Sequence, residues 1–277
     1  MSTTLEPESV DFASIKRRQK ATWEAGDFGQ VARYNIYTAE QFMARLPLKS
    51  GLRVLDVACG TGNLAVIAAR HGCETQGVDI ASNLVVQARA RAQREGLVIQ
   101  YREGDAEQLP YADGNFDAVV SMYGIMFAPQ PDLVAAELKR VLKPGGFVAL
   151  VNWTPTGFIG QMFEIFKTHL PPGPTGVPSP LLWGEEAIVK SRLRRFRKVR
   201  TARRVAIMRY PFSPADTVEF FKRYYGPTTR AFESLTIAQQ ARLRRDLVEL
   251  QTAHNMVTTP DSTEVHAEYL EVIAQAR

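Results

Sequence analysis

VLDVACGTGNLA, residues 54–65, is the stretch that decides the fold of this chain. Its apolar first part predicts a buried strand, and its glycines predict a tight turn that leads into a helix. The pattern Gly60-x-Gly62-x-x-Ala65 fits the fingerprint G-x-G-x-x-G/A, in which backbone N–H groups at a helix N-terminus receive a ligand. The stretch therefore predicts a small-molecule site, and the residues around it identify the ligand.

From Leu52 onward, strand and helix patterns alternate, which predicts an α/β fold with a parallel sheet and helices on both faces. Ser82 is expected to cap the second helix. Lys143-Pro144-Gly145-Gly146 is expected to end the third helix and open the next strand. The expected strands are residues 53–59, 74–79, 97–105, 116–124 and 145–153, and the helices are 61–71, the segment after Ser82, and 133–142.

The alternation stops after Trp153. Residues 171–180 contain five prolines and two glycines, which predicts a stiff loop. Thr236 and Gln239 have the spacing of a capping box at the start of a long helix. Beyond the loop we expect a helix at 185–193, a strand at 197–208, helices at 214–225 and 237–254, and a last strand at 264–276.

The glycine turn fits both a dinucleotide with a pyrophosphate, such as NAD, and a ligand without phosphate. Three acidic residues at strand ends distinguish between these two possibilities. Asp56 lies four residues before Gly60, where a carboxylate would repel a pyrophosphate by roughly 1 kcal/mol or more once partly desolvated. S-adenosylmethionine (AdoMet) carries a positive ammonium and a positive sulfonium, which suit that carboxylate. Asp79 can accept both ribose hydroxyls, a feature shared with NAD enzymes. Asp105 is placed to read the edge of an adenine, so the three acids together favour AdoMet over NAD.

Several segments carry a family resemblance. VLDVACGTGNLA, GVDIA (77–81), GDAEQLPYADGNFDAVVSMYG (104–124) and RVLKPGGFVAL (140–150) together resemble class I AdoMet-dependent methyltransferases. They are most similar to the small-molecule branch that includes the ubiquinone/menaquinone biosynthesis C-methyltransferases. This similarity covers about residues 50–153. TWEAGDF (22–28) also resembles a Trp-x-x-Gly-Asp-Tyr segment of related small-molecule methyltransferases, with Phe28 in place of the usual tyrosine.

The resemblance implies a Rossmann-like, doubly wound, seven-stranded and mostly parallel sheet with an antiparallel last strand. It implies AdoMet as the cofactor and S-adenosylhomocysteine as the product. Asp56, Gly60 and Gly62 would hold the methionine portion. Asp79 would bind the ribose, Asp105 the adenine edge, and Ser121 would lie beneath the sulfonium. The full set of cofactor-binding residues that it implies is Phe28, Asp56, Ala58, Gly60, Gly62, Asp79, Ile80, Asp105, Ala106 and Ser121.

Four segments are expected along the chain. Residues 1–49 would form an N-terminal helical cap, and residues 50–209 the AdoMet-binding Rossmann-like core. Residues 210–258 would be an inserted helical lid, and residues 259–277 the last core strand.

Composition narrows the class of protein. Of 277 residues, 45% are hydrophobic and 23% charged, which is ordinary for a soluble globular protein. No apolar run approaches the roughly 20 residues of a membrane span, and MSTTLEPESVDF at the N-terminus lacks a signal-peptide pattern. Cys59 and Cys73 suggest neither a disulfide framework nor a zinc site. We therefore expect a cytoplasmic protein without a bound metal.

The net charge of +5 makes an RNA or DNA methyltransferase a competing hypothesis. Residues 190–209 hold ten Lys and Arg residues and no acid, but charge runs usually mark solvated faces. SMYGIMFAPQP, after the fourth strand, lacks the Asn/Asp-Pro-Pro-aromatic motif that holds an exocyclic base amine. Nucleic acid is therefore disfavoured as the partner. A non-catalytic AdoMet-binding protein would carry the same donor-binding residues, whereas an NAD-dependent oxidoreductase is disfavoured by Asp56 and Asp105.

Methyl transfer depends on holding the nucleophile in line with the methyl group, so the protein contributes mainly orientation and exclusion of water. No single catalytic residue is therefore predicted, and His169 and His254 are only weak candidates for a base. The partner is expected to be a small-molecule acceptor in an aromatic pocket under the lid. The residues expected to line that pocket are Tyr123, Trp153, Tyr224 and Tyr225. The methylated atom and the oligomeric state are left open.

Overall fold

The computed structural model describes residues 10–277. Residues 1–9 lie outside the described residues. They include the start of the predicted cap and most of the N-terminal stretch that lacks a signal-peptide pattern. Seven strands form one sheet in the order β3-β2-β1-β4-β5-β7-β6. The strands are β1 (Arg53–Val57), β2 (Glu74–Asp79), β3 (Ile99–Glu103), β4 (Phe116–Met122), β5 (Leu142–Trp153), β6 (Arg197–Tyr210) and β7 (Thr263–Gln275).

The direction of the strands confirms the predicted sheet. Strands β1 to β5 pair in parallel, whereas β7 is antiparallel to both of its neighbours, β5 and β6. Parallel strands place their carboxyl ends at one edge of the sheet, where open α/β folds bind ligands. The fold therefore brings the three predicted acidic residues to the same edge.

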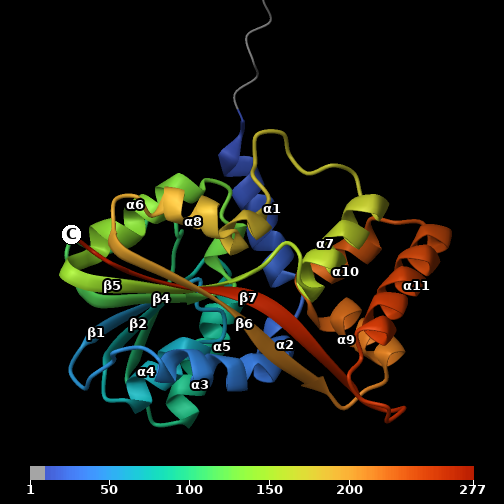
Figure 1. The fold of residues 1–277 in the computed structure, drawn as a ribbon, viewed down its shortest axis with the longest axis horizontal. Helices are drawn as coiled ribbons and strands as arrows, with labels where there is room; N and C mark the ends of the chain where they lie inside the picture. Colours follow the sequence, from blue (N-terminus) through green and yellow to red (C-terminus); the bar gives the residue numbers. More distant parts are fainter. Residues whose placement is uncertain (1–9) are drawn as a thin grey trace, which may run out of the picture.

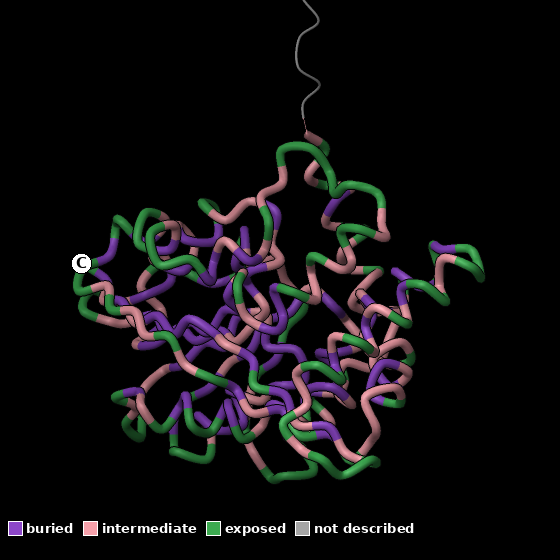
Figure 2. The backbone as a smooth tube through the Cα atoms, turned by 45° about the vertical axis from the view of Figure 1, so that its right-hand side comes forward, coloured by how far each residue is buried: buried purple, intermediate pink, exposed green. Residues whose placement is uncertain are grey.

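Helices cover both faces of the sheet (Figure 1). Helices α3 (Ile36–Ala44), α4 (Asn63–Arg70) and α5 (Ser82–Arg94) lie on one face, and α6 (Pro131–Val141) and α8 (Glu186–Arg192) on the other. The buried backbone runs mainly along the central strands between these layers (Figure 2). The largest hydrophobic cluster joins residues of the strands to Phe42, Leu138 and Trp183 from three different helices.

The remaining helices gather near the carboxyl edge of the sheet. At the N-terminus these are α1 (Phe12–Glu24), α2 (Phe28–Ala32) and the 3-10 helix η1 (Arg33–Asn35). The 3-10 helices η2 (Ile125–Phe127) and η3 (Pro180–Gly184) follow β4 and the proline-rich loop. Helices α7 (Phe158–His169), α9 (Pro214–Tyr224), α10 (Gly226–Glu233) and α11 (Ile237–Ala253) pack together beside them. No helix in residues 10–277 is long and apolar enough to cross a membrane.

Strands β6 and β7 continue beyond the end of β5. Trp153, the last residue of β5, pairs with Tyr269, which pairs in turn with Arg204. Residues 205–210 of β6 and 263–268 of β7 therefore pair only with each other, and α9 to α11 connect their far ends. This two-stranded extension therefore carries α9 to α11, the segment expected to form the lid.

Three local predictions need correction. Ser82 is not a cap: α5 begins at Ser82 with Ala81 as its N-cap, and Ser82 Oγ donates to Glu24 instead. Helix α6 ends at Val141, so Lys143–Gly146 belong to the irregular start of β5. Helix α10 was not predicted, although the capping box of Thr236 and Gln239 at the start of α11 is confirmed.

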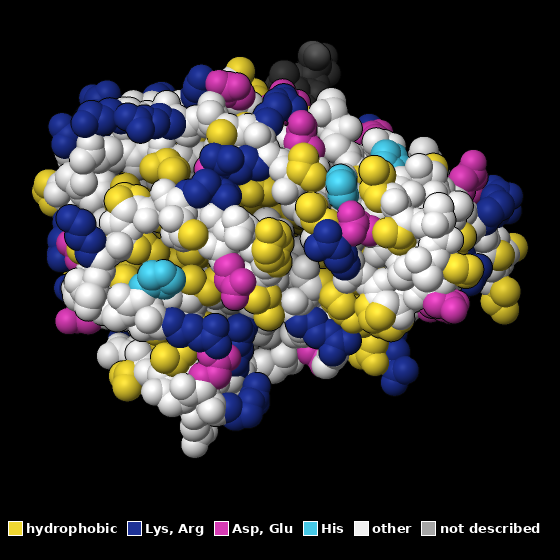
Figure 3. All heavy atoms as spheres, turned by 60° about the horizontal axis from the view of Figure 1, so that its bottom comes forward, with side chains coloured by type: hydrophobic (Ala, Val, Ile, Leu, Met, Phe, Trp, Pro, Cys, Tyr) yellow, Lys and Arg dark blue, Asp and Glu magenta, His cyan; other side chains and the backbone are white. Residues whose placement is uncertain are grey.

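Half of the ten basic residues in the segment 190–209 form ion pairs, three of them with β7. Arg203, Arg204 and Arg209 pair with Glu268, Glu271 and Glu264 of β7. Lys and Arg side chains on the face in Figure 3 form separate groups, several of them beside acidic side chains. This arrangement agrees with the interpretation of the charge run as a solvated surface.

Candidate functional site

A cavity of about 170 Å³ opens at the carboxyl edge of the sheet. Its walls come from the N-terminal helices, from the segments after β1, β2, β3, β4 and β5, and from α7, β6 and α9. Most of the predicted site residues meet there. The structure places eleven of them in its lining: Phe28, Asp56, Ala58, Gly60, Asp79, Ile80, Asp105, Ala106, Tyr123, Trp153 and Tyr225.

The glycine turn forms the floor of one half of the cavity, the half that the sequence predicts to hold the cofactor (the cofactor half). Gly62 is the N-cap of α4 in a left-handed conformation, with φ of 80°, and a Cβ there would lie 2.2 Å from Tyr101 Oη. Only glycine suits both the conformation and the close approach of that ring. Gly60 also has positive φ, and its N–H donates to Asp79 Oδ2 at 2.8 Å. The second strand thus holds the turn that follows the first.

Asp56 and Asp79 are buried carboxylates in the wall of the cavity. Asp56 is 2% exposed and accepts a hydrogen bond from Ala65 N–H at 3.0 Å. Burial raises the pKa of Asp56 to about 8, and the negative Asp79 nearby adds to the effect. Burial also raises the pKa of Asp79, although N–H groups of Ala81 and Gly60 oppose it. Neither carboxylate has a Lys or Arg ion-pair partner in residues 10–277.

A charged carboxylate is costly in such a place, so burial favours the protonated form of Asp56 until a cation reaches it. An ammonium or sulfonium group is a cation of the required sign, so these residues fit the AdoMet that the sequence predicts. A pyrophosphate would bring further negative charge to the same place.

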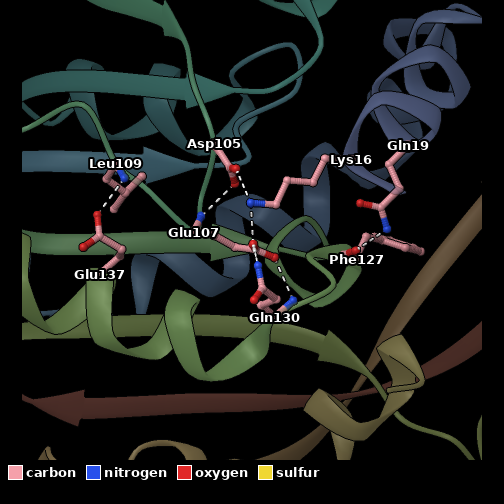
Figure 4. Close-up of polar contacts among 8 residues, drawn as sticks. All are labelled: Lys16, Gln19, Asp105, Glu107, Leu109, Phe127, Gln130 and Glu137. Atoms are coloured by element: carbon pink, nitrogen blue, oxygen red, sulfur yellow. Dashed lines mark hydrogen bonds and ion pairs between the residues drawn. The ribbon is translucent and has the colours of Figure 1, made fainter. Parts of the chain in front are cut away.

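Asp105 lies at the other end of the cofactor half. Its partner is Lys16, which the sequence did not predict. Its Oδ1 accepts from Glu107 N–H at 2.8 Å, and its Oδ2 lies 2.6 Å from Lys16 Nζ (Figure 4). Lys16 comes from α1 and also lines the cavity. No spacing in the sequence connects residue 16 with residue 105, so only the packing of α1 reveals the pair.

The second half of the cavity is apolar. The Tyr123 and Trp153 rings are stacked with 3.6 Å between their centroids and 7° between their planes. Tyr123 has a left-handed backbone, with φ of 61°, as does Ala58 with φ of 53°. Non-glycine residues in this conformation are uncommon and gather at functional sites. Apolar lining residues that the sequence did not single out are Phe127, Ile159, Met162, Phe163, Met208, Tyr210 and Phe221.

Aromatic contacts join the cofactor half to the inserted helices. Tyr225, between α9 and α10, lies with its ring centroid 5.7 Å from that of Trp23 and 6.1 Å from that of Phe28. Trp23 also packs edge-on against Phe127. The TWEAGDF segment therefore covers the cavity from above the glycine turn and contacts the segment expected to form the lid.

Two predicted cofactor-binding residues, Gly62 and Ser121, do not line the cavity. Gly62 shapes the turn from beneath, because its Cα faces Tyr101. Ser121 is fully buried and its Oγ donates to the carbonyl of Val57 at 2.7 Å, so it joins β4 to β1. Both residues act on the structure around the site.

Tyr224 and the two histidines are also outside the cavity lining. The Tyr224 ring packs against Phe220 on its own helix, since one step along α9 turns it away from Tyr225. His169 Nε2 lies 2.7 Å from Asp246, and His254 Nε2 lies 3.0 Å from Gln161 Oε1. The histidines therefore connect α7 to α11, and a role as a base stays a prediction for either of them.

The basic segment begins at the opposite edge of the sheet. Arg197 pairs with Gln275, which pairs with Phe147 near the start of β5, whereas the cavity lies at the end of β5. A nucleic acid held by the first arginines of this segment would therefore lie away from the cavity.

A methyltransferase family model and proteins from two bacteria are similar to this chain in sequence. A family model described as a methyltransferase domain matches residues 55–150. The uncharacterized protein Rv1405c of Mycobacterium tuberculosis is 34% identical over 252 residues, which cover 89% of this chain and 92% of the relative. The demethylmenaquinone methyltransferase of Thermus thermophilus is 34% identical over 128 residues, covering 45% of this chain and 58% of that protein.

Solved structures share the fold. The YcgJ protein of Bacillus subtilis has a TM-score of 0.59 at 18% identity, covering 87% of this chain and 98% of its own. The phosphoethanolamine N-methyltransferase 2 of Haemonchus contortus, solved with phosphomonomethylethanolamine and S-adenosylhomocysteine, has a TM-score of 0.58 at 18% identity. That likeness covers 98% of this chain and 62% of the other.

Proposed function

Because this chain belongs to the class I AdoMet-dependent methyltransferases, we propose that its cavity holds AdoMet over the glycine turn and a small-molecule acceptor in the apolar half. Helices α9 to α11 are the lid over that acceptor in this proposal. When bound, AdoMet supplies a methyl group on a sulfonium, which in-line displacement moves to the acceptor, leaving S-adenosylhomocysteine. The protein residues bind, orient and exclude water.

In the cofactor half, each residue has a role that its environment supports. Asp56 faces the cationic methionine end, because its buried carboxylate has no cation of the protein as a partner within residues 10–277. Asp79 receives the ribose hydroxyls at the end of β2, and Asp105 with the Ala106 backbone receives the adenine edge. Ile80 lies against the adenine, and Phe28 covers the turn at Gly60.

The observation that carries the proposal is the division of charge in the cavity. Its charged lining residues are Lys16, Asp56, Asp79 and Asp105, and all of them belong to the cofactor half. The other half presents aromatic rings and methionine side chains, such as Trp153 and Met208. Such a surface desolvates an apolar acceptor and brings its nucleophile close to the methyl group. With neither histidine in the lining, we propose that the acceptor brings a nucleophile that needs no protein base.

The chemical class of the acceptor can be inferred from the side chains of the apolar half. We infer a small, partly aromatic or prenylated acceptor, since stacked rings such as Tyr123 and Trp153 favour flat apolar groups. The name of the Thermus thermophilus relative, which matches 45% of this chain, supports an acceptor derived from a quinone, in the reduced hydroquinone form that can donate an electron pair to the methyl group. An RNA or DNA acceptor has no comparable support, because the basic segment begins at the opposite edge of the sheet.

Two neighbouring residues of β6 test whether the apolar half contacts the acceptor and not the cofactor. Met208 lines the apolar half, whereas its neighbour Arg209 is exposed and pairs with Glu264. Met208→Gln should reduce methyl transfer from labelled AdoMet to a metabolite extract by about tenfold or more, because a polar amide replaces an apolar surface that the acceptor contacts. It should leave the affinity for S-adenosylhomocysteine within about twofold of that of the parent. Arg209→Gln should change neither quantity.

Three outcomes would contradict parts of the proposal. Loss of S-adenosylhomocysteine binding in Met208→Gln would mean that the two halves are not separate. Unchanged methyl transfer in that variant would place the acceptor elsewhere. Salt-sensitive methylation of bulk tRNA would favour a nucleic-acid acceptor.

A further inference from the structure

Lys16 connects α1 to two acidic residues that follow β3. Its Nζ lies 2.6 Å from Asp105 Oδ2 and 2.5 Å from Glu107 Oε2. Figure 4 shows the side chain reaching from α1 across to both carboxylates. Lys16 is a lining residue of the cavity, and it is the one Lys or Arg in the lining within residues 10–277.

Asp105 is held from two sides. Oδ1 accepts from Glu107 N–H at 2.8 Å, and Oδ2 is in contact with Lys16. A carboxylate has about four acceptor sites, so these two contacts leave about two sites without a protein partner, and Asp105 lines the cavity. Without the ammonium group, one oxygen of Asp105 would lose its fixed position and the side chain could rotate.

Glu107 extends the network to the segment after β4. Its side chain is 1% exposed, and it accepts from both the backbone N–H and the Nε2 of Gln130 at 2.7 Å. Burial opposes the charge on Lys16, but its hydrogen bonds to Asp105 and Glu107 outweigh this and raise its pKa. The ammonium of Lys16 thus joins the segments after β3 and β4.

We propose that Lys16 is a positioning residue for the adenine end of AdoMet, acting through Asp105. It fixes the carboxylate so that its free acceptor sites face the exocyclic amine of the adenine. The inference rests on the proposed function, in which Asp105 receives that edge.

The simpler explanation is that Lys16 only docks α1, and α1 offers a matched control. Lys20, one turn further, pairs with Glu103 and lies near Glu24, but it does not line the cavity. Helix α1 also keeps contacts that need neither lysine. Gln19 Nε2 donates to the Phe127 carbonyl at 2.8 Å, and the Trp23 ring packs on the Phe127 ring. Removal of the Lys16 charge should therefore leave α1 in place.

The experiment is calorimetry with two ligands, S-adenosylhomocysteine and S-inosylhomocysteine. The second carries a carbonyl oxygen in place of the exocyclic amine, and so offers Asp105 an acceptor instead of a donor. The parent should prefer S-adenosylhomocysteine by about thirtyfold or more. Lys16→Met should weaken S-adenosylhomocysteine by about tenfold, because a charge-assisted contact orients its partner. The inosine ligand should change by less than about threefold, so the preference shrinks.

Lys20→Met should leave both affinities within about twofold of the parent. Lys16→Arg, which keeps the charge and the donors, should recover most of the preference that Lys16→Met loses. Thermal melts of each variant identify any loss of folding, and Lys16→Gln replaces Lys16→Met if the latter fails to fold.

An equal loss for both ligands in Lys16→Met would overturn the inference, because a docking role weakens binding without changing the preference. Unchanged affinities would also overturn it. If the parent protein bound neither ligand, the proposed function itself would be wrong, so the two failures are distinguishable.

Discussion

Asp56 and Asp79 hold the same glycine turn from two neighbouring strands. Asp56 of β1 pairs in register with Gly77 of β2, and Asp79 lies two residues further along. Asp79 Oδ2 accepts from Gly60 N–H at 2.8 Å, and Asp56 Oδ2 accepts from Ala65 N–H at 3.0 Å. Two buried carboxylates thus position the start of the turn and the first turn of α4, and each keeps acceptor sites for a ligand.

The first prediction concerns the pH dependence of cofactor binding. Burial raises the pKa of Asp56 to about 8, so the free protein is mostly protonated there at pH 7. Because a cationic ligand favours the carboxylate, binding at pH 7 should release about one proton. The dissociation constant for S-adenosylhomocysteine should rise about tenfold for each pH unit below 8. Calorimetry in buffers with different ionisation enthalpies measures both quantities.

Asp56→Asn should bind weakly, with a flat profile from pH 6 to 8. A parent protein with an equally flat profile would contradict the role of Asp56.

The second prediction is that the same carboxylate destabilises the unliganded protein. Its pKa in the folded state, about 8, is above the unfolded value of about 3.9. The folded protein therefore binds more protons between these values, and the free energy of unfolding should fall as the pH rises from 4 to 8. Asp56→Asn removes this effect, so it should melt at a higher temperature than the parent at pH 8 and at a similar temperature at pH 4. Thermal melts without ligand measure this, and a lower melting temperature of the variant at pH 8 would refute it.

The third prediction uses two adjacent tyrosines. Tyr225 lines the cavity and contacts Trp23 and Phe28, whereas Tyr224 packs on Phe220 outside it. Tyr225→Ala should lower methyl transfer to a metabolite extract by about tenfold or more, because it opens the cover of the cavity. Tyr224→Ala should lower it by less than about threefold. Equal effects of the two substitutions would mean that packing of the helix, and not the cavity, determines the result.

The fourth prediction is that neither histidine acts as a base. His169 pairs with Asp246, and His254 contacts Gln161, both outside the cavity lining. His169→Gln and His254→Gln should keep methyl transfer within about threefold of the parent at pH 7. His169→Gln should also lose part of the contact between α7 and α11, which a thermal melt detects. A loss of about a hundredfold in either variant, with folding intact, would restore a catalytic histidine.

The cofactor half of the site was predictable because its residues are close in sequence to strand ends. β2 was predicted with its observed bounds, Glu74–Asp79, and the carboxyl ends of parallel strands bring Asp56, Asp79 and Asp105 together. The apolar half was predicted only in part: Tyr123, Trp153 and Tyr225 line the cavity as expected, but most of the other apolar lining residues were not singled out. Met208 and Phe221 reach the cavity only through the packing of β6 and α9, and no local pattern distinguishes them from other core residues.

The errors have local causes. Gly226-Pro227 reads as a helix breaker, but proline is well tolerated in the first turn of a helix, and α10 begins there. Serine is often an N-cap residue, but at the start of α5 the N-cap is Ala81, whose N–H donates to Asp79 Oδ1.

The extension of β6 and β7 beyond β5 has a consequence for redesign. Residues 205–268 leave the sheet as one continuous segment that carries Met208, Phe221 and Tyr225, while Asp56, Asp79 and the glycine turn belong to other strands. Grafting this single segment from a relative should change the part of the acceptor surface that Met208, Phe221 and Tyr225 supply, while Tyr123 and Trp153 stay in place. The graft is feasible because its two ends lie on paired, adjacent strands. Chimaeras made this way would keep their donor chemistry while acquiring a new substrate range.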